Sequence, residues 1–180
     1  GVRVEAYTIK IGGVSAPEVS DEGIAERYGN PVRCPDPDAA ARMVKVIEKA
    51  RSQGDSVGGV VECRVTGLPP GVGNPIFDGL EGDLSKALFS IPAVKAVEFG
   101  SGVKAADMWG SSHNDPFRLE DGKVVTESNN AGGILGGIST GMPIKCRVTF
   151  KPTPSISKPQ KTVDLSRMEE VFIRVKGRHD

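Results

Sequence analysis

Strands are predicted wherever hydrophobic and polar residues alternate along the chain. Alternation is clear at residues 2–11, 60–66, 144–150 and 171–175, and residues 94–99 also predict a strand. For residues 60–66 the pattern is that of a half-buried strand, with its polar residues outward. The residues that share one face are Val2, Val4 and Ala6; Val61, Cys63 and Val65; and Ile144, Cys146, Val148 and Phe150. The residues on the opposite faces include Arg3, Glu5, Tyr7, Glu62 and Arg64.

Two helices are predicted where apolar residues recur at intervals of three and four. The first begins with Asp36 as its cap and Pro37 at the first helical position, and Gly54 ends it. The second ends at Pro92, which cannot donate a backbone hydrogen bond. Their apolar stripes are Ala40, Met43, Val44, Ile47 and Ala50, and Leu84, Ala87, Leu88 and Ile91.

This order of elements predicts an α+β fold in which amphipathic helices cover one face of a largely antiparallel sheet. We interpret residues 1–180 as part of a single domain. Residues 14–35 show little periodicity and contain three prolines, so we expect an exposed connecting excursion there.

Composition restricts the possible partners. The chain has 23 lysines and arginines and 23 aspartates and glutamates, so no net charge draws it to nucleic acid or an anionic membrane. Its three widely spaced cysteines favour neither a disulfide framework nor a zinc site and indicate a reducing, cytoplasmic location. No apolar run approaches the length of a membrane span, and residues 1–5 lack the layout of a signal peptide. We expect a soluble protein without a metal.

The glycine-rich run at residues 128–141 is the first candidate site, because glycine lets a backbone approach a ligand closely. It does not match a dinucleotide-binding turn, since Thr126 to Asn130 do not form the buried strand that must precede one. A nucleotide P-loop is excluded because no Gly-Lys-Ser/Thr follows. Tight packing or turns remain the alternative explanation.

Two further segments carry charge next to restricted backbone. Lys151-Pro152-Thr153-Pro154-Ser155 combines a cation, two hydroxyls and two prolines, which suits binding of a phosphate tail. The alternative is that the segment is only a rigid exit from a strand, with a solvated lysine. Arg178 and Asp180 are two residues apart, so on an extended chain both side chains point the same way. They form either a site for a substrate anion or a surface ion pair.

These segments, in this order, resemble chorismate synthase. The resemblance extends through residues 54–59, 67–73, 75–78 and 88–95 and covers nearly all of the chain beyond about residue 35. It implies a β-α-β sandwich, a homotetramer and a lyase of the shikimate pathway of aromatic amino-acid synthesis. The implied reaction converts 5-enolpyruvylshikimate 3-phosphate to chorismate and phosphate with reduced flavin mononucleotide (FMN), and the resemblance also associates the family with NADP.

The same resemblance implies roles for individual residues. Residues aligned with flavin contacts are Pro92, Ala93, Gly136, Lys151, Pro152, Thr153, Pro154, Ser155 and Arg178. Arg178 also aligns with a position at the substrate site, and Asp180 is a candidate for proton transfer near the flavin. The two histidines, His113 and His179, are expected to be structural, and Trp109 is expected to pack.

The chain lacks an initiating methionine and the family's amino-terminal histidine and arginine motifs, so we expect a central-to-late fragment that is inactive alone. The alternative functions are a non-catalytic flavin- or phosphometabolite-binding module and a purely structural α+β domain.

Overall fold

A computed structural model describes residues 1–20 and 22–176. Its strands are β1 Arg3–Ile11, β2 Val14–Ser15, β3 Gly59–Thr66, β4 Val94–Phe99, β5 Phe117–Glu120, β6 Lys123–Thr126, β7 Ile134–Leu135, β8 Ile138–Ser139, β9 Ile144–Phe150, β10 Gln160–Asp164 and β11 Glu169–Ile173. Its helices are α1 Pro37–Ser52, α2 Leu80–Phe89 and α3 Gly110–His113, with 3-10 helices η1 Glu22–Gly29 and η2 Gly102–Asp107.

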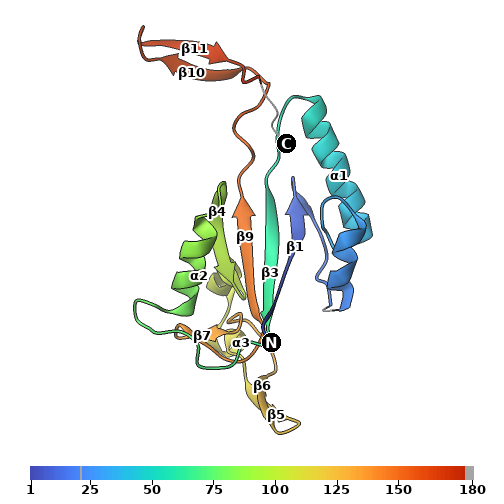
Figure 1. Ribbon diagram of the computed structural model, residues 1–180, viewed down its shortest axis with the longest axis vertical. Helices are drawn as coiled ribbons and strands as arrows, with labels where there is room; N and C mark the ends of the chain where they lie inside the picture. Colours follow the sequence, from blue (N-terminus) through green and yellow to red (C-terminus); the bar gives the residue numbers. More distant parts are fainter. Residues whose placement is uncertain (21, 177–180) are drawn as a thin grey trace. The chain divides into compact units, whose positions relative to one another are not determined.

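The central sheet has the strand order β2-β1-β3-β9-β4, and Figure 1 shows β1, β3, β9 and β4 side by side. The pairs β1–β2 and β4–β9 are antiparallel, and three separate antiparallel hairpins pair β5 with β6, β7 with β8 and β10 with β11. Helices and largely antiparallel strands therefore form the predicted α+β fold. All five predicted strands are present, although the last, predicted at residues 171–175, lies at Glu169–Ile173.

The described residues cluster into two compact units, and β1 contributes residues to both. Unit 1 comprises residues 1–7 and 60–150, which include β3, β4, β9 and the glycine-rich run. Unit 2 comprises residues 8–59 and the chain from Lys151 onward, which include α1, η1 and the β10–β11 hairpin.

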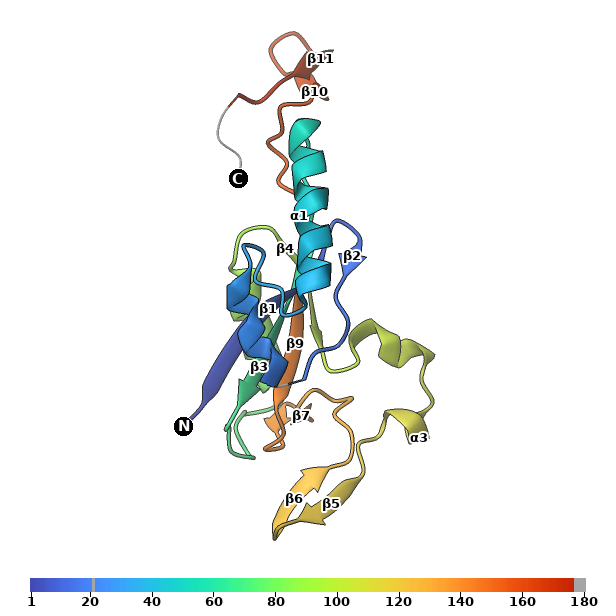
Figure 2. The same cartoon turned by 90° about the vertical axis from the view of Figure 1, so that its right-hand side faces the viewer.

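Helix α1 begins as predicted and supplies the core of unit 2. The Asp36 carboxylate accepts a hydrogen bond from Ala39 N at 2.6 Å, and Pro37 occupies the first helical turn. Figure 2 shows α1 beside β2. Its buried residues Ala39, Ala40 and Met43 cluster with Cys34, whereas Ile47, a predicted member of the stripe, is 37% exposed.

Strand β3 corrects one prediction, because its polar face is the more buried one. Glu62 and Arg64 are buried, whereas Cys63 is only partly so. Strand β1 behaves in the same way, since Tyr7 is buried and Val4 is 64% exposed. Alternation located the strands, but it could not show which face is buried. These polar side chains can be buried because they form hydrogen bonds or ion pairs with one another.

The segment at residues 14–35 is not uniformly exposed. It contains β2 and η1, and its residues Ile24 and Cys34 are completely buried. Arg27 is also buried and donates a hydrogen bond to Ile24 O at 2.8 Å. The expectation of exposure therefore holds for only part of this segment. Trp109, which was expected to pack, is 82% exposed.

Candidate functional site

The end of β9 lies beside the start of β4 in unit 1, next to the predicted Pro92-Ala93 contact. Val94 pairs with Phe150, so the Pro92-Ala93 turn lies next to the residue that precedes Lys151. Ala93 has φ +71°, a left-handed conformation that costs a residue with a side chain roughly 1–2 kcal/mol. Strained backbone of this kind is common at ligand sites.

The segment at residues 151–155 continues from β9 without regular structure. Lys151, Pro152, Thr153 and Pro154 are exposed and Ser155 is partly buried. Within the described part of the chain, Lys151 makes no ion pair or side-chain hydrogen bond. Because the two prolines restrict φ, the segment presents a cation and two hydroxyls on a stiff backbone. This combination of groups is suited to an anion such as a phosphate.

The glycine-rich run forms the β7–β8 hairpin, whose two-residue turn is Gly136-Gly137. Both turn residues have positive φ, +59° and +82°, as the tight hairpin requires. At Gly133 a Cβ would lie 2.6 Å from Pro143 O, so close packing explains that glycine. A Cβ at Gly136 would meet no atom within 4 Å, and the residue is exposed. Gly136 therefore offers open backbone to a ligand, while packing accounts for Gly133.

Asp115 holds the start of this run, a role that the sequence analysis missed. Its carboxylate accepts hydrogen bonds from Ser128 Oγ at 2.6 Å, Asn130 N at 2.7 Å and Ala131 N at 2.9 Å. Partial burial opposes ionisation, but these hydrogen bonds outweigh it and lower the pKa of Asp115 below its ordinary value. No motif marks the residue; its only signal is an aspartate shortly before a glycine-rich turn.

Gly136 and the Pro92-Ala93 turn lie at opposite ends of β9. Lys145 N donates to Gly132 O at 3.2 Å, which places the glycine-rich run at the start of this strand, whereas Val94 pairs with its last residue. Seven residues of strand span about 20 Å. Figure 1 shows the β7 hairpin at the end of β9 away from its arrowhead. A single chain therefore does not bring Gly136 next to the Pro92-Ala93 turn.

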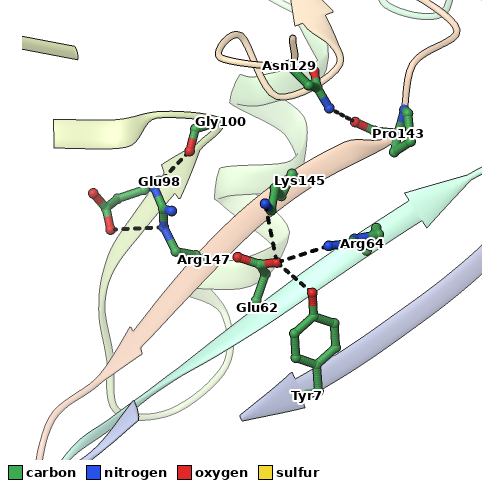
Figure 3. Close-up of polar contacts among 9 residues, drawn as sticks. All are labelled: Tyr7, Glu62, Arg64, Glu98, Gly100, Asn129, Pro143, Lys145 and Arg147. Atoms are coloured by element: carbon green, nitrogen blue, oxygen red, sulfur yellow. Dashed lines mark hydrogen bonds and ion pairs between the residues drawn. The ribbon is translucent and has the colours of Figure 1, made fainter. Parts of the chain in front are cut away.

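The buried polar face of the sheet carries a charged cluster in unit 1. Figure 3 shows Tyr7, Arg64 and Lys145 converging on Glu62, which accepts a hydrogen bond from Tyr7 Oη at 2.6 Å. Arg64 Nη2 and Lys145 Nζ lie 3.7 and 3.9 Å from Glu62 Oε1. Burial, and then the hydrogen bond to Glu62, raise the pKa of Tyr7. These groups keep the sheet face polar, although the alternation pattern assigned them to the less buried side.

A second ion pair extends this polar face on β4 and β9. Arg147 Nε lies 3.7 Å from Glu98 Oε2, and Arg147 Nη2 donates to Gly100 O at 2.8 Å (Figure 3). Gly100 in turn donates its N–H to Lys145 O of β9 at 2.9 Å, and it packs against the backbone of Asn130 and Gly132 in the glycine-rich run. The cluster thus supports the backbone around the glycine-rich run.

Other site predictions fall outside this geometry. Arg178 and Asp180 lie outside the described residues. Among residues 1–20 and 22–176, no group of three or more histidine, cysteine or acidic side chains is arranged to hold a metal ion. No helix in the same residues is both long and apolar enough to cross a membrane.

The fold and the site define an α+β protein. A stiff segment that carries the Lys151 cation follows β9, and the last residue of β9 pairs with the residue after the Pro92-Ala93 turn. The chorismate synthase family model matches residues 1–180. Chorismate synthases of Korarchaeum cryptofilum and Methanosarcina mazei are 56% and 55% identical to the chain over 181 residues, which cover 100% of the chain and 50% of each relative. A crystal structure of chorismate synthase has a TM-score of 0.78 and 31% identity, over 86% of this chain and 50% of that one.

The chain therefore belongs to the chorismate synthase family, which confirms the resemblance found in the sequence. It spans about half the length of the relatives that it matches.

Proposed function

We propose that this chain is the flavin-binding portion of a chorismate synthase, a lyase that converts 5-enolpyruvylshikimate 3-phosphate to chorismate and phosphate with reduced FMN. Family membership supports this reaction. The observation that carries the proposal for this chain is the stiff Lys151–Ser155 segment. The segment directly follows Phe150 at the end of β9, and Phe150 pairs with Val94, the residue after the Pro92-Ala93 turn. Within the shikimate pathway the product serves aromatic amino-acid synthesis.

The described residues fit a flavin phosphate and ring in different ways. Lys151 and the hydroxyls of Thr153 and Ser155 would bind the anionic tail, because a cation and neutral donors complement phosphate oxygens. Pro92 and Ala93 offer no polar side-chain group, so they would contact the flavin through backbone atoms. Gly136 would contribute open backbone. Its place at the other end of β9 means that another part of the assembled enzyme has to complete the site.

The reaction is a 1,4-elimination without net redox change, to which bound reduced FMN supplies electron density. The protein has to hold the substrate ring against the flavin, remove a proton and stabilise the departing phosphate. We assign anion binding at flavin and substrate to Arg178 and proton handling near the flavin to Asp180. Both assignments rest on the family motif at residues 177–180.

We further propose that the full-length enzyme is a cytoplasmic homotetramer and that this 180-residue chain is inactive alone. The relatives have about twice its length, and the family's amino-terminal histidine and arginine motifs do not occur in it.

Arg178→Ala in the full-length enzyme should lower turnover at least about tenfold, because loss of one donor to developing charge typically costs roughly 2.7–4 kcal/mol of barrier. Steady-state chorismate formation under anaerobic conditions measures this effect. Wild-type turnover in the variant would remove the role assigned to Arg178.

The test of the function itself is anaerobic chorismate formation, followed by absorbance, with reduced FMN and 5-enolpyruvylshikimate 3-phosphate. Turnover by the full-length protein and none by this chain would support both proposals. A folded full-length protein that binds reduced FMN without turnover would instead be a binding module. A protein that binds no flavin would contradict the proposed function.

A further inference from the structure

The turn at Gly54-Asp55-Ser56 ends helix α1 in unit 2 and has no role in the function proposed so far. Gly54 has φ +66°, and the N–H groups of Gly54 and Asp55 donate to Arg51 O at 3.0 Å and Ala50 O at 2.9 Å. This arrangement is the Schellman motif, in which a left-handed glycine lets the last helical carbonyls find donors. The helix end therefore fixes where the side chains of Asp55 and Ser56 lie.

These three residues contact the chain around residues 153–158, about a hundred positions away in sequence. Ser56 Oγ donates to Thr153 O at 2.7 Å, and Lys158 N donates to Gly54 O at 3.1 Å. Lys158 Nζ pairs with Asp55 Oδ2 at 2.8 Å. The hydrogen bond from Lys158, followed by that from Ser56 N, lowers the pKa of Asp55.

Gly54 itself leaves no space for a side chain at this contact. A Cβ at Gly54 would lie 2.5 Å from Ser157 Oγ, whose hydroxyl donates to Gly54 O at 3.4 Å. The turn and the segment are therefore joined by one backbone–backbone hydrogen bond, from Lys158 N to Gly54 O, and by contacts of the Ser56, Ser157 and Lys158 side chains. The contact thus involves Gly54, Asp55 and Ser56 on one side and Thr153, Ser157 and Lys158 on the other.

The contacts involve the carbonyl groups of the proline-rich segment and leave its ligand-binding groups available. Pro152 and Pro154 have no N–H to donate, and the backbone contacts of the segment are made by the carbonyls of Thr153 and Pro154. They accept hydrogen bonds from Ser56 Oγ and from Gln160 Nε2, the latter at 3.0 Å. Within residues 1–20 and 22–176, Lys151 Nζ and the Thr153 hydroxyl are not used in side-chain hydrogen bonds.

We infer that the Gly54–Ser56 turn is a positioning element that fixes the Lys151–Ser155 segment in its phosphate-binding conformation before the flavin arrives. This inference rests on the proposed function. Because the prolines make the segment stiff, the hydrogen bond from Ser56 to the carbonyl between them restricts the position of the whole segment, together with the bond from Gln160 to Pro154 O. A segment held in this way loses little conformational entropy when it binds, so flavin affinity depends on residues that do not touch the flavin.

The experiment uses the full-length protein with Ser56→Ala, which removes the hydroxyl, and Ser56→Thr, which retains one. Ser52→Ala is the matched control, because the Ser52 hydroxyl also donates to a backbone carbonyl, Lys49 O at 2.8 Å, but does so away from the segment. Two quantities are measured for each variant: the dissociation constant of reduced FMN, and amide hydrogen exchange over residues 153–158 in the flavin-free protein.

Ser56→Ala should raise the dissociation constant about fivefold, the equivalent of a typical hydrogen bond, and should speed exchange at the Lys158 amide. Ser56→Thr should restore both, and Ser52→Ala should change neither. Faster exchange in Ser56→Ala with unchanged flavin affinity would make the turn purely structural and overturn the inference. A wild-type protein that binds no reduced FMN would instead overturn the proposed function, and the inference with it.

Discussion

Gly133 and Gly136 show how two glycines of one run are required for different reasons. Both have positive φ, +80° and +59°, but only Gly133 lies against another backbone, that of Met142 and Pro143. Glycine avoids the strain of a left-handed conformation at both positions, and at Gly133 it also avoids a steric clash. Packing thus explains part of the run, and the exposed Gly136 is the glycine to examine for ligand contact.

Gly133→Ala should lower the free energy of unfolding of the full-length protein by about 2 kcal/mol or more, since backbone strain and overlap with Pro143 O act together. Gly136→Ala is the matched control and should cost only the strain, about 1 kcal/mol. Urea denaturation followed by circular dichroism measures both values. Equal losses would contradict the packing explanation for Gly133.

At the scale of elements, the hairpins depend on two-residue turns and on polar anchors. Gly12-Gly13, Asp121-Gly122 and Gly136-Gly137 all have positive φ at both positions, the conformation of type I′ turns. Asp115 then anchors the strand-free stretch between β6 and β7 through three hydrogen bonds. The glycine-rich run is therefore held at its first residues by a carboxylate and at its tip by turn geometry.

Asp115→Asn should lower the free energy of unfolding by about 2 kcal/mol at pH 7, because hydrogen bonds to a charged acceptor are lost. The folded-state pKa of Asp115 lies below its unfolded value, so its contribution is present above the unfolded pKa of about 3.9 and is lost as pH falls through the folded pKa. The difference between wild type and variant should therefore shrink in strongly acidic solution. Urea denaturation from pH 7 down to about 2 measures it.

The control for this prediction is Asp121→Asn, a change of the same charge at the exposed tip of the β5–β6 hairpin, where asparagine also tolerates positive φ. That variant should show little loss at any pH. A pH-independent loss in Asp115→Asn would contradict the assignment of the carboxylate as the anchor.

Much of this element structure could be predicted from the sequence, and the remainder has identifiable causes. Alternation located β1, β3, β9 and β11, the segment at residues 94–99 was also predicted as a strand, and the Asp36-Pro37 pair located the start of α1. The β5–β6 hairpin was missed although Asp121-Gly122 is a typical turn signal, because its flanking strands are only four residues long. The prediction of which face of β3 is buried was wrong, because hydropathy cannot show that Glu62 contacts Tyr7, Arg64 and Lys145.

At the scale of the whole molecule, the sequence identified the family, and the structure separates two of the predicted site elements of unit 1. The Pro92-Ala93 turn and the strand end that leads into Lys151 meet at the β4–β9 pairing, whereas Gly136 lies at the other end of β9. No sequence spacing reveals this division, because it depends on strand direction and register. The roles of all these residues in flavin binding stay predictions.

Binding of reduced FMN to full-length wild-type protein and to Lys151→Ala, measured anaerobically by titration, tests the central claim most directly. Lys161→Ala, at an exposed lysine on β10, is the matched control. The account predicts that Lys151→Ala raises the dissociation constant about tenfold or more, since a charge-assisted contact to phosphate is lost, while Lys161→Ala leaves it unchanged. Equal affinity in wild type and Lys151→Ala would contradict the assignment of residues 151–155 as the flavin-binding segment.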